Sequence, residues 1–265
     1  YGRSNKCPDV IYRCRMLKIG IIGGSGLDNP TLLKNPQEVE HETLFGQPSS
    51  TIKEGRINNI EVALLARHGR EHTIPPSQVN NRANIWALQH ARVTHVIAVA
   101  AVGGIAAELG PGALVIPHQV IDYTWSRQHT YFEEDLAYVI HVDFTEPYCP
   151  ELREMILQGA QGANVAVIDS GVYGATQGPR LETAAEIDRL ERDGCTVVGM
   201  TGMPEAALAR ELGLCYAAIN VVANKAAGRG EGEITLDDIR QTLETAMESV
   251  RALIEATIGC VIKPV

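Results

Sequence analysis

The sequence lacks three features, each of which would assign it to a different class of protein. Its 265 residues contain no run of about 18 apolar residues, so no membrane-spanning helix is expected. Lys and Arg number 23 against 32 Asp and Glu, and the resulting charge of −9 argues against a binder of nucleic acids or anionic membranes. No repeat and no Ser/Gly-rich linker divides the chain. A small anionic substrate is still compatible with this negative charge, because a binding site can be locally positive.

The six cysteines form no pattern typical of a metal site or of a disulfide scaffold. None belongs to a CxxC pair or lies near a histidine at zinc-ligand spacing. We therefore expect no metal site, a buried Cys215 thiol within an apolar run, and a reducing, cytoplasmic setting. Residues 1–15 lack the apolar core of a secretory signal, and we interpret them as an N-terminal extension.

What the sequence does contain is an alternation of short apolar runs and amphipathic stretches. The runs predict strands at 17–22, 60–66, 94–101, 112–116, 119–122, 164–176, 196–200 and 214–224. The amphipathic stretches predict helices at 77–91, 151–162, 181–194, 204–213 and 235–258. This order predicts one α/β domain over residues 16–260 with a largely parallel or mixed sheet. Ligands bind such sheets where strands end and helices begin, and the polar clusters of this sequence stand at those ends.

A glycine-rich loop, Gly23-Gly24-Ser25-Gly26, follows the first predicted strand. Glycines permit positive φ and leave N–H groups free to surround an anion, with help from the Ser25 hydroxyl. A tight turn is the plainer alternative. The loop lacks both the third glycine of GxGxxG and the Gly-Lys-Ser/Thr ending of a P-loop, which weakens the case for nicotinamide or ATP binding.

Two further strand ends carry groups suited to an anion. Arg67 offers a planar fork of donors that matches phosphate, and His68 adds a ring whose charge changes near neutral pH. A solvated pair at a strand end is the alternative, and His72 is equally compatible with a surface loop. The small residues 100–104 end another strand, where they either admit a ligand to the backbone or simply pack closely.

Taken together and in order, these motifs resemble the methylthioadenosine phosphorylase branch of the trimeric purine nucleoside phosphorylases. The matching segments are residues 21–27, 65–74, 84–88 and 200–205, and segments 177–183 and 199–212 are most similar to the methylthioinosine-type members. The resemblance covers residues 16 to about 258. It implies a homotrimer with sites near subunit contacts, and a twisted mixed sheet of partial-barrel form flanked by helices. It also implies reversible phosphorolysis of a purine nucleoside without a metal or an organic cofactor, inorganic phosphate being the co-substrate.

This chemistry needs an anion site, a surface under the ribose and a donor to the base. The ribosyl centre becomes cationic as the glycosidic bond breaks, and the departing purine gathers negative charge, so positioning and electrostatics carry most of the catalysis. By motif match, the phosphate-binding residues are Ser25, Arg67, His68, Thr201 and the backbone N–H of Ala101. Met200 would lie under the ribose.

Two of these residues have alternative roles, and one position departs from the pattern of the related enzymes. Thr201 is also suited to capping the helix that follows it, and Met200 alone is more typical of a core. Related enzymes carry Thr or Asn where this chain has Ala100, so one side-chain contact to phosphate is missing.

The base is predicted from two positions. Adenine-type relatives have an Asp that faces purine N7, whereas this chain has Asn224, followed by Lys225 and Ala226, and has Glu182 after Gly-Pro-Arg-Leu. Glu182 can accept from N1–H of a 6-oxopurine, and Asn224 can donate to N7 or O6; a buried mismatch of this polarity is costly. Separately, Glu182 is also compatible with a solvated helix start, and Asn224 with a turn at a strand end. Together with His68 they are the candidate catalytic residues.

The sugar is predicted from the start of the last helix. A 5′-methylthio group favours an apolar wall, and Leu236 matches the position that faces this group in the methylthio branch, although a Leu is equally typical of core packing. S-methyl-5′-thioinosine is therefore the expected substrate, ahead of inosine or guanosine and then methylthioadenosine. A nucleotide- or flavin-binding redox protein and a non-enzymatic nucleotide-binding protein remain as alternatives of other classes.

Overall fold

The computed structural model describes residues 17–23, 32–134 and 138–260, so the predicted extension 1–15 and the start of the domain at residue 16 lie outside it. Its strands are β1 (Lys18–Gly23), β2 (Lys34–Val39), β3 (Ile52–Ile57), β4 (Ile60–Ala66), β5 (His95–Gly104), β6 (Leu114–Val115), β7 (Gln119–Asp122), β8 (Val172–Ala175), β9 (Val197–Gly199) and β10 (Cys215–Lys225). Its helices are a short 3₁₀ turn at Pro76–Gln78, α1 (Asn81–His90), α2 (Pro150–Ala163), α3 (Ala184–Arg192), α4 (Glu205–Glu211) and α5 (Leu236–Cys260).

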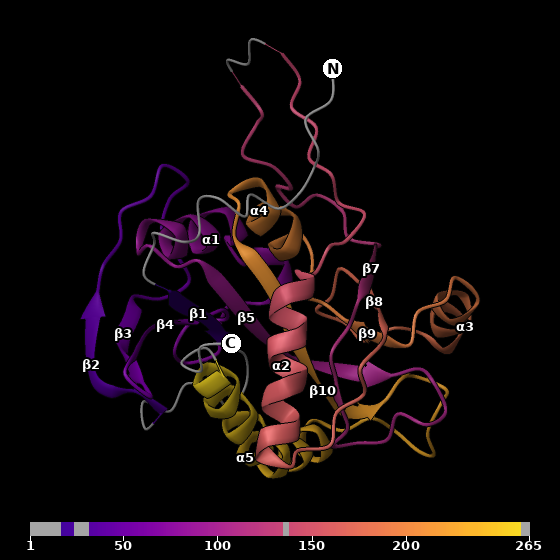
Figure 1. Cartoon of the computed structure of the whole chain (residues 1–265). Coiled ribbons are helices and arrows are strands. Elements are labelled where there is room, and N and C mark those ends of the chain that lie inside the picture. Colours follow the sequence, from indigo (N-terminus) through magenta and orange to yellow (C-terminus); the bar gives the residue numbers. More distant parts are fainter. Residues whose placement is uncertain (1–16, 24–31, 135–137, 261–265) are drawn as a thin grey trace.

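The strands form one mixed sheet in the order β2-β3-β4-β1-β5-β9-β8-β7, and β10 branches from β5 to reach β6 (Figure 1). The central pairs β1–β4, β1–β5 and β5–β10 are parallel, whereas β2–β3, β3–β4 and β5–β9 are antiparallel. Parallel central strands end at the same edge, which gathers the loops that follow them. The predicted α/β class with a mixed sheet flanked by helices is confirmed.

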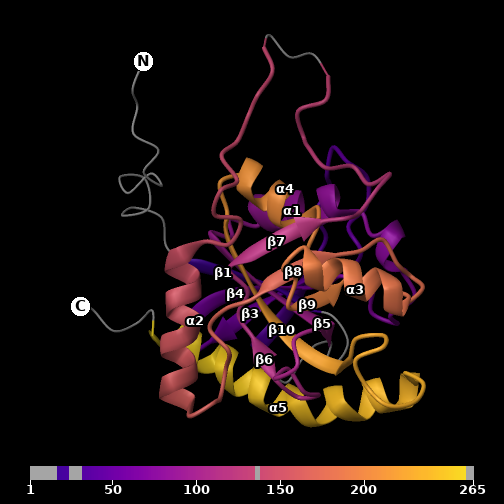
Figure 2. The ribbon, with the colours of Figure 1, turned by 90° about the vertical axis from the view of Figure 1, so that its right-hand side faces the viewer.

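Two layers of helices cover the sheet (Figures 1 and 2). On one face, side chains of β10 such as Ile219 pack against α2 and α5; on the other, alternate residues such as Ala218 pack against α1 and α4. The smaller α3 packs on β8 and β9 through Ile187 and Leu190. Because both faces of β5 and β10 are covered, these strands are almost wholly apolar, which is why their sequences predicted them well.

Several boundaries differ from the sequence predictions for identifiable reasons. β2 and β3 were not predicted because they are polar strands, β2 at the edge of the sheet and β3 next to it, without the apolar signal of a buried strand. The strand predicted at 164–176 shrinks to β8. The helix predicted from residue 77 begins at Asn81, because a 3₁₀ turn follows Pro75 and the Asn80 side chain then accepts from the Ala83 N–H at 3.1 Å, which caps α1. No helix in the described segments is both long and apolar enough to cross a membrane.

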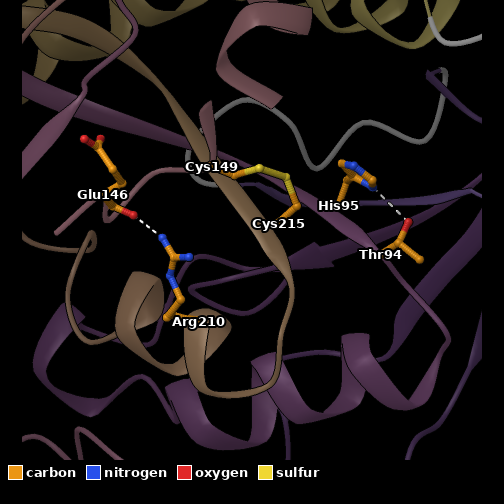
Figure 3. The surroundings of a disulfide bond; sticks show 6 residues. All are labelled: Thr94, His95, Glu146, Cys149, Arg210 and Cys215. Atoms are coloured by element: carbon orange, nitrogen blue, oxygen red, sulfur yellow. Dashed lines mark hydrogen bonds between the residues drawn. A yellow bond between two sulfur atoms is a disulfide. The ribbon is translucent and has the colours of Figure 1, made fainter. Parts of the chain in front are cut away.

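A disulfide joins Cys149, the residue before α2, to Cys215, the first residue of β10 (Figure 3). The Cα atoms are 5.3 Å apart, and the Cys149 N–H donates to the Tyr216 carbonyl at 2.7 Å. The prediction of a free Cys215 thiol was therefore wrong. The two cysteines are 66 residues apart, and only the packing of α2 against β10 brings them together. Among the described residues, Cys195 and Cys260 are free.

Candidate active site

A cavity of about 400 Å³ opens where the parallel strands β4, β5 and β10 end. Its size lies within the usual range for small-molecule sites. The predicted site residues that line it are Arg67, His68, Ala101, Glu182, Met200, Thr201, Asn224 and Ala226. These residues come from five separate sequence segments, so the structure brings the predicted phosphate, ribose and base groups into one cavity.

Arg67 follows β4 and is held rigidly at one end of the cavity, with 1% of its surface exposed. Its Nε and Nη2 donate to the two oxygens of Glu205 at 2.8 and 3.0 Å, and its Nη1 donates to the Val99 carbonyl at 2.9 Å. A guanidinium carries five N–H groups, so two remain for a ligand. Burial alone would lower the pKa of Arg67, but the Glu205 carboxylate more than offsets this and raises it, so Arg67 stays charged.

His68 lies beside Arg67 and is neutral at neutral pH. Burial, followed by the positive charge of Arg67, lowers its pKa to about 4. Its Nδ1 lies 2.8 Å from the Ile74 carbonyl, and because a carbonyl can only accept, Nδ1 carries the proton. Nε2 then carries a lone pair instead of a proton and can accept a hydrogen bond. The ring of His72, which also lines the cavity, lies 4.6 Å from that of His68, so this histidine belongs to the cavity wall.

Thr201 follows β9 and presents a buried hydroxyl that has no hydrogen-bond partner among the described residues. Its N–H donates to the Tyr173 hydroxyl at 3.2 Å. The alternative role as a helix cap is not observed, since Pro204 occupies the N-cap of α4 and no side chain caps it. A buried hydroxyl without a partner at a cavity wall is suited to a polar ligand.

Glu182 and Asn224 form the base-suited part of the cavity. One oxygen of Glu182 accepts from the Thr176 hydroxyl at 2.6 Å. The Asn224 amide donates to the Lys225 carbonyl at 2.7 Å, which leaves its second N–H available. The register of β10 against β5 shifts between Val222 and Asn224, and such a bulge redirects the side chains that follow it.

Met200 lines the cavity against the loop that carries Gly178. Gly178 has a φ of +60°, and a Cβ at this position would overlap the Met200 sulfur, so a glycine is required here. Ile234 and Ile239 supply the apolar wall near the start of α5. Leu236, the residue predicted for this wall, is 70% exposed and does not line the cavity of the single chain.

Lys225, another predicted substrate-binding residue, points away from the cavity. Its ammonium donates to the Ala107 carbonyl at 2.6 Å, and it is not part of the lining. Ser25 lies outside the described residues. Ala100 lines the cavity with only a methyl group. Within the part of the chain that the structure describes, no three His, Cys, Asp or Glu side chains are grouped as a metal site would need.

Sequence reasoning missed the layer beneath the cavity. Glu205 is fully buried and holds Arg67, and Tyr173 is buried and binds the Thr201 N–H. Glu205 ends the matching segment 200–205, but an acidic residue at a helix start is normally interpreted as a solvated cap, so its buried role was not predicted.

Comparison with known proteins places the fold among characterised families. A family model described as the phosphorylase superfamily matches residues 18–259. Proteins named probable S-methyl-5'-thioinosine phosphorylase from Xylella fastidiosa (strain Temecula1) and Pseudomonas syringae pv. tomato are 51% and 50% identical to this chain. They cover 90% and 92% of it, and 96% and 99% of their own lengths are matched.

More distant relatives extend the comparison. A probable 6-oxopurine nucleoside phosphorylase from Dictyoglomus turgidum is 42% identical over 91% of both chains. A solved structure of methylthioadenosine phosphorylase from Schistosoma mansoni with adenine superposes with a TM-score of 0.87, at 33% identity, over 92% of each chain.

Proposed function

The chain belongs to the phosphorylase superfamily, and from that premise we propose that it catalyses reversible phosphorolysis of a 6-oxopurine nucleoside, first of all S-methyl-5'-thioinosine. Phosphate and this nucleoside would give hypoxanthine and 5-methylthioribose 1-phosphate. The observation that carries the proposal is the meeting, in one 400 Å³ cavity, of an anion-suited cluster with a base-suited pair. The cluster is Arg67, His68 and Thr201, and the pair is Glu182 and Asn224.

The cluster fits phosphate because it offers donors and an acceptor in fixed places. Arg67 keeps two N–H groups, Thr201 has an unpartnered hydroxyl, and His68 Nε2 can accept the proton of a P–OH group. A phosphate oxygen then forms a bond to C1′ while the bond from C1′ to N9 breaks, and that electron pair leaves with the purine. The phosphate anion stabilises the cationic ribosyl centre. Ser25 and the Ala101 backbone remain predicted contributors.

The pair fits a 6-oxopurine because each member offers the complementary group. Glu182 accepts from N1–H, and the remaining Asn224 N–H donates to N7 or O6, where negative charge accumulates as the base departs. Adenine presents the reverse polarity on this edge, so a site of this kind disfavours it. The relatives named 6-oxopurine nucleoside phosphorylase agree with this choice.

The preference for a methylthio group over a hydroxyl at the 5′ position is the more specific part of the proposal. Ile234 and Ile239 form an apolar wall, and Met200 lines the cavity with a thioether. A 5′-hydroxyl would leave a polar group against this wall, which costs free energy, whereas a 5′-methylthio group would be buried favourably. Inosine or guanosine is the second candidate.

One set of assays tests the proposal against its alternatives. The protein is incubated with methylthioinosine, inosine and methylthioadenosine, with and without phosphate, and free base is measured. We expect phosphate-dependent release of hypoxanthine, fastest from methylthioinosine. Release of adenine in preference would favour methylthioadenosine, the substrate in the name of the Schistosoma enzyme. Nucleoside binding without any release would indicate a non-enzymatic binding protein.

We further propose that the chain acts as a homotrimer, as the resemblance implies. Exposed apolar side chains at Tyr138, Val139 and Ile140, and at Leu236, would be covered by a neighbouring chain. Light scattering on the purified protein measures the mass directly. The cytoplasmic location stays a prediction, and the disulfide argues against the reducing setting on which it was based.

A further inference from the structure

Glu205 is the most deeply buried carboxylate among the described residues, and it lies beneath the cavity without lining it. It is the first residue of α4. Its two oxygens accept three hydrogen bonds: Arg67 Nε at 2.8 Å, Arg67 Nη2 at 3.0 Å and the Tyr216 hydroxyl at 2.7 Å. The fork of Arg67 and the two oxygens of Glu205 therefore fix the plane of the guanidinium.

Stability alone does not explain this arrangement. Removing two charges from water carries a large free-energy cost for each ion, and well-packed apolar residues often stabilise a core as well as a buried ion pair does. An apolar pair at Arg67 and Glu205 would fill the same space between β4 and α4. The ion pair is more readily explained by what one partner does at the cavity wall.

The charge balance supports the same explanation. Glu205 cancels the charge of Arg67, and His68 is neutral at neutral pH. Phosphate therefore meets directed N–H and O–H groups rather than excess positive charge, so its affinity depends on where those groups point. A guanidinium held on one side by two contacts can point its remaining N–H groups in only one direction.

We propose that Glu205 is a positioning residue for phosphate: it sets the orientation of Arg67, and Tyr216 in turn holds the Glu205 carboxylate. This inference rests on the proposed phosphorolysis and names the buried residues that orient the phosphate-binding groups of its site. Tyr216 also follows Cys215, and its ring stacks on that of Tyr148 at 6.1 Å, so the support for Arg67 is anchored beside the disulfide.

Glu205→Gln is the first test, because it keeps the shape of the side chain. Its amide N–H₂ opposes the Arg67 donors, so only one of the two contacts can persist and the guanidinium tilts. A displacement of about 1 Å at a reacting group costs on the order of 100-fold in rate. We expect KM and Kd for phosphate to rise about tenfold or more and kcat to fall, while the Kd of the nucleoside alone stays within about twofold.

Tyr216→Phe is the second test, and it also covers the case in which Glu205→Gln does not fold. It removes one hydrogen bond to the carboxylate and leaves the Arg67 contacts, so a smaller rise in phosphate KM, of about threefold, is expected. Glu211→Gln is the matched control: it is the same substitution in the same helix, away from Arg67, and should leave phosphate KM unchanged.

Two results would overturn the proposal. A lower melting temperature with unchanged phosphate affinity in both test variants would show that Glu205 and Tyr216 are only structural. Tighter phosphate binding in Glu205→Gln would show that the carboxylate only offsets charge. Calorimetric titration with inorganic phosphate keeps this test separate from the proposed reaction: if the parent protein releases no base, phosphorolysis fails, while the effect of Glu205 on phosphate binding is still measured.

Discussion

Asn224 and His68 show how single atoms decide what this cavity can bind. Each has one side-chain group already engaged by a backbone carbonyl, Lys225 for Asn224 and Ile74 for His68. The contact of His68 places its proton on Nδ1 and leaves Nε2 as an acceptor. The contact of Asn224 leaves one amide N–H as a donor, and its amide oxygen remains an acceptor.

Asn224→Asp should reduce kcat/KM for hypoxanthine release from methylthioinosine by at least about tenfold, equivalent to about 1.4 kcal/mol of transition-state stabilisation. An ionised Asp cannot donate to N7 or O6 and repels the charge that develops on the base. Steady-state assays with methylthioinosine and methylthioadenosine measure the change. Unaltered phosphate affinity in the same variant serves as the control, and release of hypoxanthine at the parental rate would contradict the base assignment.

The neutral state of His68 predicts how stability depends on pH. Its pKa is about 4 in the folded chain and near 6.5 in the unfolded chain, so between these values the unfolded state binds more protons. The contribution of neutral His68 to the free energy of unfolding is therefore fully present above about pH 6.5. It is lost as the pH falls toward 4, and the loss amounts to roughly 1–3 kcal/mol.

Chemical denaturation of the parent and of His68→Gln, in buffers without phosphate, tests this expectation. Gln does not titrate, so the free energy of unfolding of the parent should decline relative to the variant between pH 6.5 and 4. Subtracting one curve from the other removes the groups that titrate in both proteins. A constant difference across this range would show that His68 is not buried in its neutral form.

At the scale of elements, the start of α5 is where sequence and structure differ in a way that bears on specificity. Thr235 accepts from the Asp238 N–H at 3.1 Å and so begins the helix where the sequence predicted. The helix then turns Ile239 toward the cavity and Leu236 toward solvent.

Ile239→Thr should therefore lower selectivity for methylthioinosine over inosine by about tenfold, because it replaces part of the apolar wall with a hydroxyl. Leu236→Thr is the matched variant, with the same kind of change at an exposed position of the same turn. The measurement is kcat/KM for both substrates. A loss of selectivity in Leu236→Thr instead would support the original sequence prediction, with Leu236 acting across a subunit contact.

The fold could be predicted from sequence wherever burial is two-sided, and the cavity lining wherever a residue such as Arg67, Thr201 or Asn224 lines the cavity itself. β5 and β10 carried clear apolar runs, and Arg67, Thr201 and Asn224 carried motifs. The edge strand β2 and its neighbour β3 had no such pattern, since the sequence of a polar strand resembles that of a loop. Glu205 and Cys149 were missed because their roles depend on partners more than 60 residues away.

At the scale of the whole molecule, the disulfide joins the start of α2 to the sheet strand β10 by a bond that no single element predicts. Cross-linking two residues 66 positions apart restricts the unfolded chain and typically contributes about 2–4 kcal/mol. Reduction, or the substitution Cys149→Ser together with Cys215→Ser, should lower the melting temperature by roughly 5–15 °C. Calorimetry with and without reductant measures this, and the double variant should show no response to reductant. Equal melting temperatures in all conditions would show that the bond does not stabilise the fold.

The same bond closes a covalent ring, residues 149 to 215, and this ring holds Glu182, Met200, Thr201 and Glu205. A protease that cuts inside the ring, for example after the exposed Arg180, would open the chain without releasing either piece. The nicked protein would run as one band on a denaturing gel and separate into two only after reduction. The fragment with Arg67 and His68 would thus stay attached, through Cys149, to the fragment with Glu182, Thr201 and Asn224, so damage to the exposed loop at Arg180 need not dismantle the cavity.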